Sequence, residues 1–187
     1  MIYATLQHRK EDESALYPLR DFVKIDFNGN GSVLNELNKL FTTAENLLKE
    51  VAVAELKILA ERKKEANKNI VNAIKSRKGV SDAISKARNA WQEYSTATNY
   101  YKGINKVEYE VETARDILAE LGFKQCHTSF TPDRIAVAEF SYEGKQEDLE
   151  EKVQELLTHY QRLKESHLLG LNLQYGVSTA QEEQVSE

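Results

Sequence analysis

The feature that most constrains this chain is a helical pattern of apolar residues over 33–121, broken by one short turn. Apolar residues recur at three- and four-residue steps over 37–59 and again over 83–121, the spacing that places them on one helix face. Between the two stretches, Arg77-Lys78-Gly79 supplies cations for the last turn of a helix and a glycine for a left-handed cap. Two long helices joined by so short a turn must run antiparallel. The sequence therefore predicts an antiparallel, coiled-coil-like helical hairpin over 33–121, with its tip near Lys78-Gly79.

The same geometry predicts which side chains meet between the two helices. A turn at this position pairs residues whose numbers sum to about 157. Trp91 then lies opposite Ala66, the one apolar residue within the charged stretch 61–69. Because a large side chain facing a small one makes a packed seam, we expect Trp91 to pack against Ala66.

One segment inside the hairpin fits two secondary structures. Residues 106–112 read KVEYEVE, a strict alternation that also suits a strand, and Gly103 just before them could serve as the break. The helical repeat over 104–121 is longer and more regular. It favours helix, without removing the strand alternative.

The rest of the chain predicts a small base. In the N-terminal segment 1–32, residues 2–6 suit a short strand, and residues 22–27 suit either a strand buried on both faces or one helical turn. Within 122–170, two strand-like runs flank the turn Thr131-Pro132-Asp133-Arg134 and predict a β-hairpin, and an amphipathic helix follows over 145–169.

The end of the chain is acidic and lacks a clear repeat. Residues 171–187 predict a tail after a helix that ends at Gly170, with a short edge strand at 171–175 left open. The expected fold class is therefore α+β and mainly α: a long helical hairpin on a small base that holds a β-hairpin and a C-terminal helix.

Composition excludes several classes of protein. One cysteine in 187 residues rules out a disulfide framework and any multi-cysteine metal site. No apolar run is long enough to span a membrane, and the first residues lack a signal-peptide core. We expect a soluble, cytoplasmic protein that does not associate with membranes.

Charge is strongly segregated along the sequence. The formal net charge of −5 divides into +7 over residues 57–88 and −12 elsewhere. Three interpretations of this basic stretch remain open: a solvated helix face, a binding surface for an acidic protein, or a binding surface for a nucleic-acid phosphate backbone. The candidate partner- or phosphate-binding residues are Arg62, Lys63, Lys64, Lys68, Lys75, Arg77, Lys78, Lys86, Arg88 and Trp91.

Residues 26–33 read DFNGNGSV and resemble the first eight positions of an EF-hand calcium loop. The resemblance implies Asp26, Asn28 and Asn30 as oxygen ligands. However, the twelfth position is Leu37, where that loop requires a bidentate glutamate. A plain turn followed by a helix cap is the favoured interpretation, and we expect no cofactor and no resident metal.

No Gly-rich phosphate loop, paired-histidine helix or serine nucleophile motif occurs in the sequence. The leading expectation is a non-enzymatic interaction protein that docks on a protein partner through the hairpin, such as a phage- or plasmid-type modulator or inhibitor of a host complex. A nucleic-acid-binding accessory protein that uses the basic tip is the first alternative. A homodimeric structural helical bundle is the second.

Overall fold

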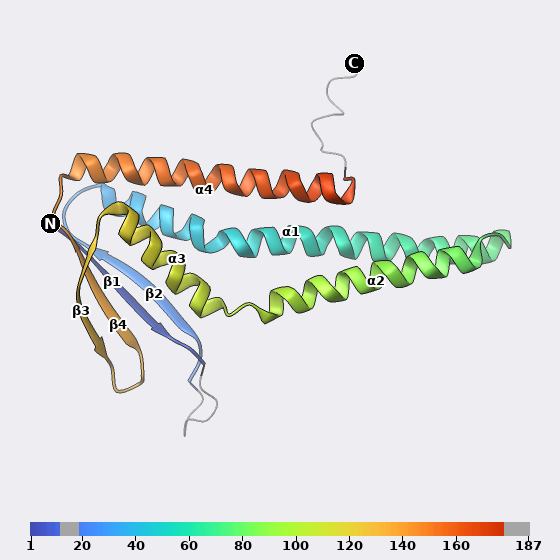
Figure 1. The fold of residues 1–187 in the computed structure, drawn as a ribbon, viewed down its shortest axis with the longest axis horizontal. Helices are drawn as coiled ribbons and strands as arrows, with labels where there is room; N and C mark the ends of the chain where they lie inside the picture. The colour runs from blue at the N-terminus through green and yellow to red at the C-terminus, as the bar shows by residue number, and fades with distance from the viewer. Residues whose placement is uncertain (12–18, 178–187) are drawn as a thin grey trace, which may run out of the picture. The chain divides into compact units, whose positions relative to one another are not determined.

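The computed structural model describes residues 1–11 and 19–177, and it confirms the α+β, mainly α fold class. The strands are β1 (Ile2–Arg9), β2 (Phe22–Asn28), β3 (Lys124–Phe130) and β4 (Ala136–Tyr142). The helices are α1 (Val33–Ser76), α2 (Val80–Gly103), α3 (Lys106–Leu121) and α4 (Gln146–Tyr175). The chain divides into two compact units, and α1 and α4 each contribute to both (Figure 1).

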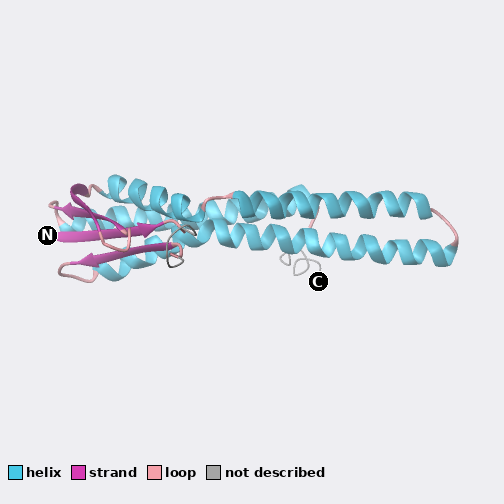
Figure 2. Cartoon of the chain, turned by 90° about the horizontal axis from the view of Figure 1, so that it is seen from below, coloured by secondary structure: helices cyan, strands magenta, loops and turns pink. Residues whose placement is uncertain are grey.

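The first unit contains residues 1–47 and 105–162 and is built on a four-stranded antiparallel sheet of order β2-β1-β4-β3 (Figure 2). Along β1, the buried side chains of Ile2, Ala4 and Leu6 alternate with more exposed ones, as expected when one sheet face packs on a core. That core is completed by α3, by residues 33–44 of α1 and by the first turns of α4.

The structure resolves both ambiguous segments of the sequence. Residues 22–28 form the edge strand β2, in which Val23, Ile25 and Phe27 pack against the core. The expected burial on both faces is wrong, because the alternate residues at 24, 26 and 28 are exposed. Residues 106–121 are helical, so the longer helical repeat outweighs the short alternation at 106–112. The predicted β-hairpin is also confirmed, because β3 and β4 pair antiparallel across the expected turn.

The second unit contains residues 48–104 and 163–177 of the described chain. In it, α1 and α2 lie side by side and antiparallel (Figures 1 and 2), which confirms the predicted helical hairpin. We call residues 57–96 of this pair the hairpin arm. The arm turns near the predicted position, but Arg77 rather than a glycine adopts the left-handed conformation that ends α1, with φ of 55°. The Lys78 amide then donates to the Ala73 carbonyl, and Gly79, with φ of 66°, caps α2.

The sequence predicts one continuous second helix over 81–121, and this prediction is wrong. The helix stops at Gly103, Ile104 is extended, and α3 starts anew after Asn105. Glycine is a poor helix former, and the Asn105 side chain accepts a hydrogen bond from the Glu108 amide as a new N-cap. The apolar repeat passes through this break, so periodicity alone did not reveal it.

The expected helix end at Gly170 and the possible edge strand at 171–175 are also wrong, because α4 continues to Tyr175. Leu171 is buried, and the Tyr175 hydroxyl donates to Glu55 over 2.8 Å. These contacts offset the cost of a helical glycine, which is about 1 kcal/mol. The true C-terminal cap is Gly176, with φ of 66°. The part of the predicted acidic tail beyond residue 177 lies outside the described residues.

The predicted Trp91–Ala66 pair is wrong as well. Trp91 is 58 % exposed, whereas Ala87 and Ala90 are the buried residues of α2. Ala66 and Ala90 instead line one common groove between the helices. Adjacent helix positions differ by about 100° around the axis, so α2 is rotated by roughly a quarter turn from the predicted orientation, with Ala90 rather than Trp91 at the seam.

Candidate functional site

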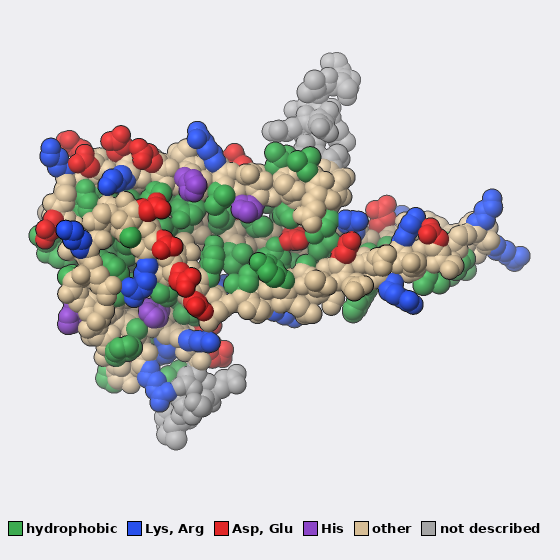
Figure 3. Space-filling model, in the orientation of Figure 1, with side chains coloured by type: hydrophobic (Ala, Val, Ile, Leu, Met, Phe, Trp, Pro, Cys, Tyr) green, Lys and Arg blue, Asp and Glu red, His purple; other side chains and the backbone are tan. Residues whose placement is uncertain are grey.

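All ten candidate residues of the basic stretch lie on the hairpin arm. Arg62 is paired with Glu93 at 3.9 Å, and Lys86 with Asp82 at 3.1 Å. Both pairs are solvent-exposed, so each contributes little to stability. Seven of the candidate cations form no ion pair within the described residues 1–11 and 19–177: Lys63, Lys64, Lys68, Lys75, Arg77, Lys78 and Arg88. In Figure 3, cationic side chains are visible along this arm and gather at its turn.

One side of the arm carries an apolar groove between α1 and α2. The groove has a volume of about 570 Å³, and its apolar lining is Ile70, Ile84, Ala87 and Trp91. Arg88 also lines it, and no carboxylate among the described residues does. We call this surface the Trp91 groove.

Lysine 63 places a second cation next to the Trp91 groove, although it does not line the groove itself. Its Nζ lies 5.4 Å from the centroid of the Trp91 ring and 4.5 Å from that of Tyr94. Cation–π contacts of this kind hold the ammonium group over the aromatic faces. Trp91, the only tryptophan of the chain, is therefore flanked by the apolar lining of the groove and by the ammonium group of Lys63.

The opposite side of the arm has a different character. A second groove there, about 610 Å³ in volume, is lined by the carboxylates Glu65, Asp82 and Glu93 and by the cations Arg62 and Lys86. Because these charges largely balance one another, this side resembles an ordinary solvated helix surface. Only the Trp91 side combines exposed apolar area with charge of one sign.

Exposed apolar side chains are concentrated in the second unit. Of the twelve large hydrophobic residues exposed within the described chain, nine belong to it: Val53, Val71, Ile74, Ile84, Trp91, Tyr100, Leu169, Leu173 and Val177. Scattered exposed residues need no explanation, but a contiguous apolar surface usually marks a binding site. The cluster around Ile84 and Trp91 is the contiguous one, because both residues line the same groove.

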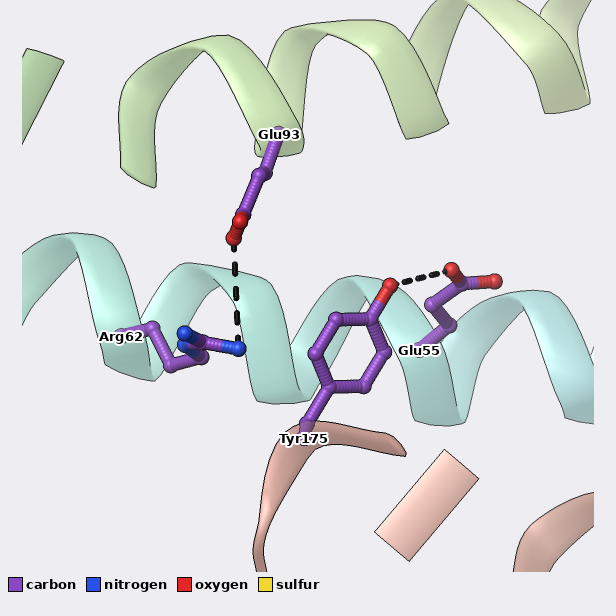
Figure 4. A network of polar contacts seen from close by, with 4 residues as sticks. All are labelled: Glu55, Arg62, Glu93 and Tyr175. Atoms are coloured by element: carbon purple, nitrogen blue, oxygen red, sulfur yellow. Dashed lines mark hydrogen bonds and ion pairs between the residues drawn. The ribbon is translucent and has the colours of Figure 1, made fainter. Parts of the chain in front are cut away.

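A polar cluster in the second unit, shown in Figure 4, was not predicted from the sequence. The Glu55 carboxylate accepts hydrogen bonds from the hydroxyls of Tyr101 and Tyr175. The Arg62 guanidinium lies 5.4 Å from the centroid of the Tyr175 ring, and it also pairs with Glu93. A signal did exist, since Glu55 interrupts the apolar face of α1 one turn before Leu59.

Both phenols of this cluster are held in their neutral form. Burial, followed by the hydrogen bond to Glu55 and its negative charge, raises the pKa of Tyr175 to about 12. The same causes in the same order raise the pKa of Tyr101. A neutral phenol is a hydrogen-bond donor and a carboxylate is an acceptor, so the three side chains form a stable donor–acceptor set around Glu55 at neutral pH.

The calcium-loop residues do not lie in an EF-hand. Asp26 and Asn28 belong to β2, so a strand precedes the loop where the motif needs a helix. Asp26 pairs instead with Lys24 at 3.4 Å. Within the described residues, no group of three or more His, Cys, Asp or Glu side chains could hold a metal ion.

Comparisons with protein-family models, with curated proteins and with solved structures find no significant match to this chain. No helix among the described residues is both long and apolar enough to cross a bilayer.

Proposed function

We propose that this protein is a non-enzymatic interaction protein that binds a protein partner through the Trp91 groove. The observation that carries the proposal is the exposed apolar lining of that groove around Ile84 and Trp91. A large aromatic side chain in an apolar groove is a frequent centre of binding energy at protein interfaces. Burying it on a partner removes apolar area from water, which favours association.

The shape of the groove favours a helical partner segment. Its lining on α2 extends from Ile84 to Thr96, a length of about 18 Å along the helix axis. An amphipathic helix of about twelve residues has the same length and can place its apolar face in a groove between two helices.

The charge of the groove favours an acidic partner. Arg88 lines it, and Lys63 lies over the Trp91 ring. Carboxylates on the flanks of a bound helix would meet these cations and increase the association rate. A second copy of the chain is disfavoured at this surface, because each of the two arms that would meet there carries a net charge of +6, from ten cations and four anions.

The test uses Trp91 as a built-in reporter. A designed 14-residue amphipathic helix with a leucine face and glutamate flanks is titrated into the protein, and the same peptide with lysine flanks serves as the charge control. We expect a blue shift of Trp91 emission with the acidic peptide and binding at least tenfold weaker for the basic one. Ile84→Asp should abolish the shift, whereas Val53→Asp, at a more exposed position outside the groove, should leave it unchanged.

Four outcomes would overturn the proposal. The first is no spectral shift with either peptide, and the second is equal loss of binding in Ile84→Asp and Val53→Asp. In the third, a DNA or RNA duplex binds with a steep salt dependence while the acidic peptide does not, which indicates the nucleic-acid alternative. A dimer by size-exclusion chromatography with light scattering that Ile84→Asp dissociates would indicate self-association instead.

A further inference from the structure

The second unit also contains a cleft between α1, α2 and the end of α4, which adjoins the Trp91 groove at Gln92 and Thr96. We call it the tyrosine cleft. It has a volume of about 670 Å³, and its lining includes Tyr100, Tyr101 and Tyr175 together with the carboxylates Glu55 and Glu93. No lysine or arginine among the described residues lines it. Three aromatic rings and two carboxylates in one cleft favour a positively charged ligand.

We propose that the tyrosine cleft binds an alkylguanidinium group, the chemistry of an arginine side chain or of a free guanidino compound. The protein already places a guanidinium at the border of this cleft. Arg62 lies over the Tyr175 ring at 5.4 Å, and its Nη1 lies 3.9 Å from Glu93 (Figure 4). The same two kinds of contact are therefore compatible with a second guanidinium inside the cleft.

The cleft retains unused binding capacity. Tyr100 as a residue is 66 % exposed, and its ring contacts that of Tyr101 with ring planes at 73°, so Tyr100 is accessible to a ligand. The Glu93 side chain is half-exposed, and its pair with Arg62 is long. A ligand guanidinium is planar, and its N–H groups point outward in that plane. Its face can therefore stack on Tyr100 while its N–H groups donate to Glu93.

The hydrogen bonds around Glu55 preorganise the cleft. Its carboxylate holds the hydroxyls of Tyr101 and Tyr175, which come from two different helices. The rings are therefore positioned before a ligand arrives, which lowers the entropic cost of binding. The acceptors in the lining, two carboxylates and the side-chain amides of Asn89 and Gln92, favour a cation with N–H donors over a quaternary ammonium.

The probe is n-butylguanidinium, and its neutral isostere n-butylurea is the control. Titration is followed by NMR shifts of the tyrosine ring protons of the full-length protein. We expect a dissociation constant on the order of 1 mM for the guanidinium, as suits so small a ligand, and no saturable binding of the urea. Glu93→Gln should weaken binding by about five- to tenfold.

The matched control is Glu65→Gln, which removes the same charge from an exposed glutamate that does not line the cleft. Equal affinities of n-butylurea and n-butylguanidinium, or equal losses in Glu93→Gln and Glu65→Gln, would overturn the proposal. An acetylated Gly-Arg-Gly peptide amide separates the two sources: affinity equal to the probe indicates a protein arginine, and tenfold weaker affinity indicates a free compound. Because Ile84 and Trp91 do not line this cleft, Ile84→Asp should leave guanidinium binding unchanged, and the two proposals therefore fail independently.

Discussion

Replacing Tyr175 with phenylalanine removes one hydroxyl from the end of α4 and should lower the free energy of unfolding by about 1 kcal/mol at pH 8. The hydroxyl donates to the Glu55 carboxylate over 2.8 Å. Hydrogen bonds to charged groups contribute about 1.5–3 kcal/mol when buried, and partial exposure reduces this figure. Tyr101 continues to donate to Glu55 in the variant, so the carboxylate keeps one partner.

The cost of this substitution should depend on pH in a defined direction. The pKa of Tyr175 is about 12 in the folded protein, against about 10 for an unperturbed tyrosine. Between these values the unfolded chain loses the phenolic proton and the folded protein keeps it, so stability falls as pH rises. If the whole pKa difference of two units acted on stability, the free energy of unfolding would fall by about 2.7 kcal/mol over this pH range. We expect a fall of about 1 kcal/mol, because the Tyr175 hydroxyl is partly solvated.

Urea unfolding followed by far-UV circular dichroism at pH 8, 10 and 11.5 tests this expectation. The difference between the wild type and Tyr175→Phe should be near 1 kcal/mol at pH 8 and should approach zero at pH 11.5. Tyr100→Phe is the control, because Tyr100 is largely exposed, and its cost should stay below about 0.5 kcal/mol. A difference between wild type and Tyr175→Phe that does not change with pH would refute the reasoning.

Two further predictions concern the ends of helices, at Arg77 after α1 and at Asn105 before α3. Arg77→Gly should raise the free energy of unfolding by about 0.5–1 kcal/mol in urea, because Arg77 has φ of 55° and glycine adopts this conformation without steric cost. Lys78→Gly removes the same charge at a residue without positive φ, and an equal gain there would contradict this explanation. Asn105→Ala should cost about 1 kcal/mol through loss of the cap to the Glu108 amide, measured as a lower urea midpoint. Asn105→Ser retains a capping oxygen, and an equal loss in that variant would rule out capping as the cause.

Short-range signals predicted most of the secondary structure. The turn at Arg77-Lys78-Gly79, the β-hairpin and the helix over 106–121 each follow from residues close together in the sequence. Such elements depend on glycine conformations, capping residues and local repeats, all of which a sequence displays directly. The position of the candidate cations on the hairpin arm was also predictable, because the helical repeat fixes their order along the arm.

The sequence by itself thus determined the elements, the hairpin and the basic arm, and the tertiary structure decided which faces meet. Rotation of α2 put Ala90 in the seam and left Trp91 exposed, a choice that adjacent positions on one helix leave open. Contacts of Leu171 and Tyr175 extended α4 through Gly170, where local propensity predicted an end. Glu55 and Tyr175 meet although 120 positions separate them. Distant pairs of this kind depend on how whole helices pack, and no local pattern in the sequence records that packing.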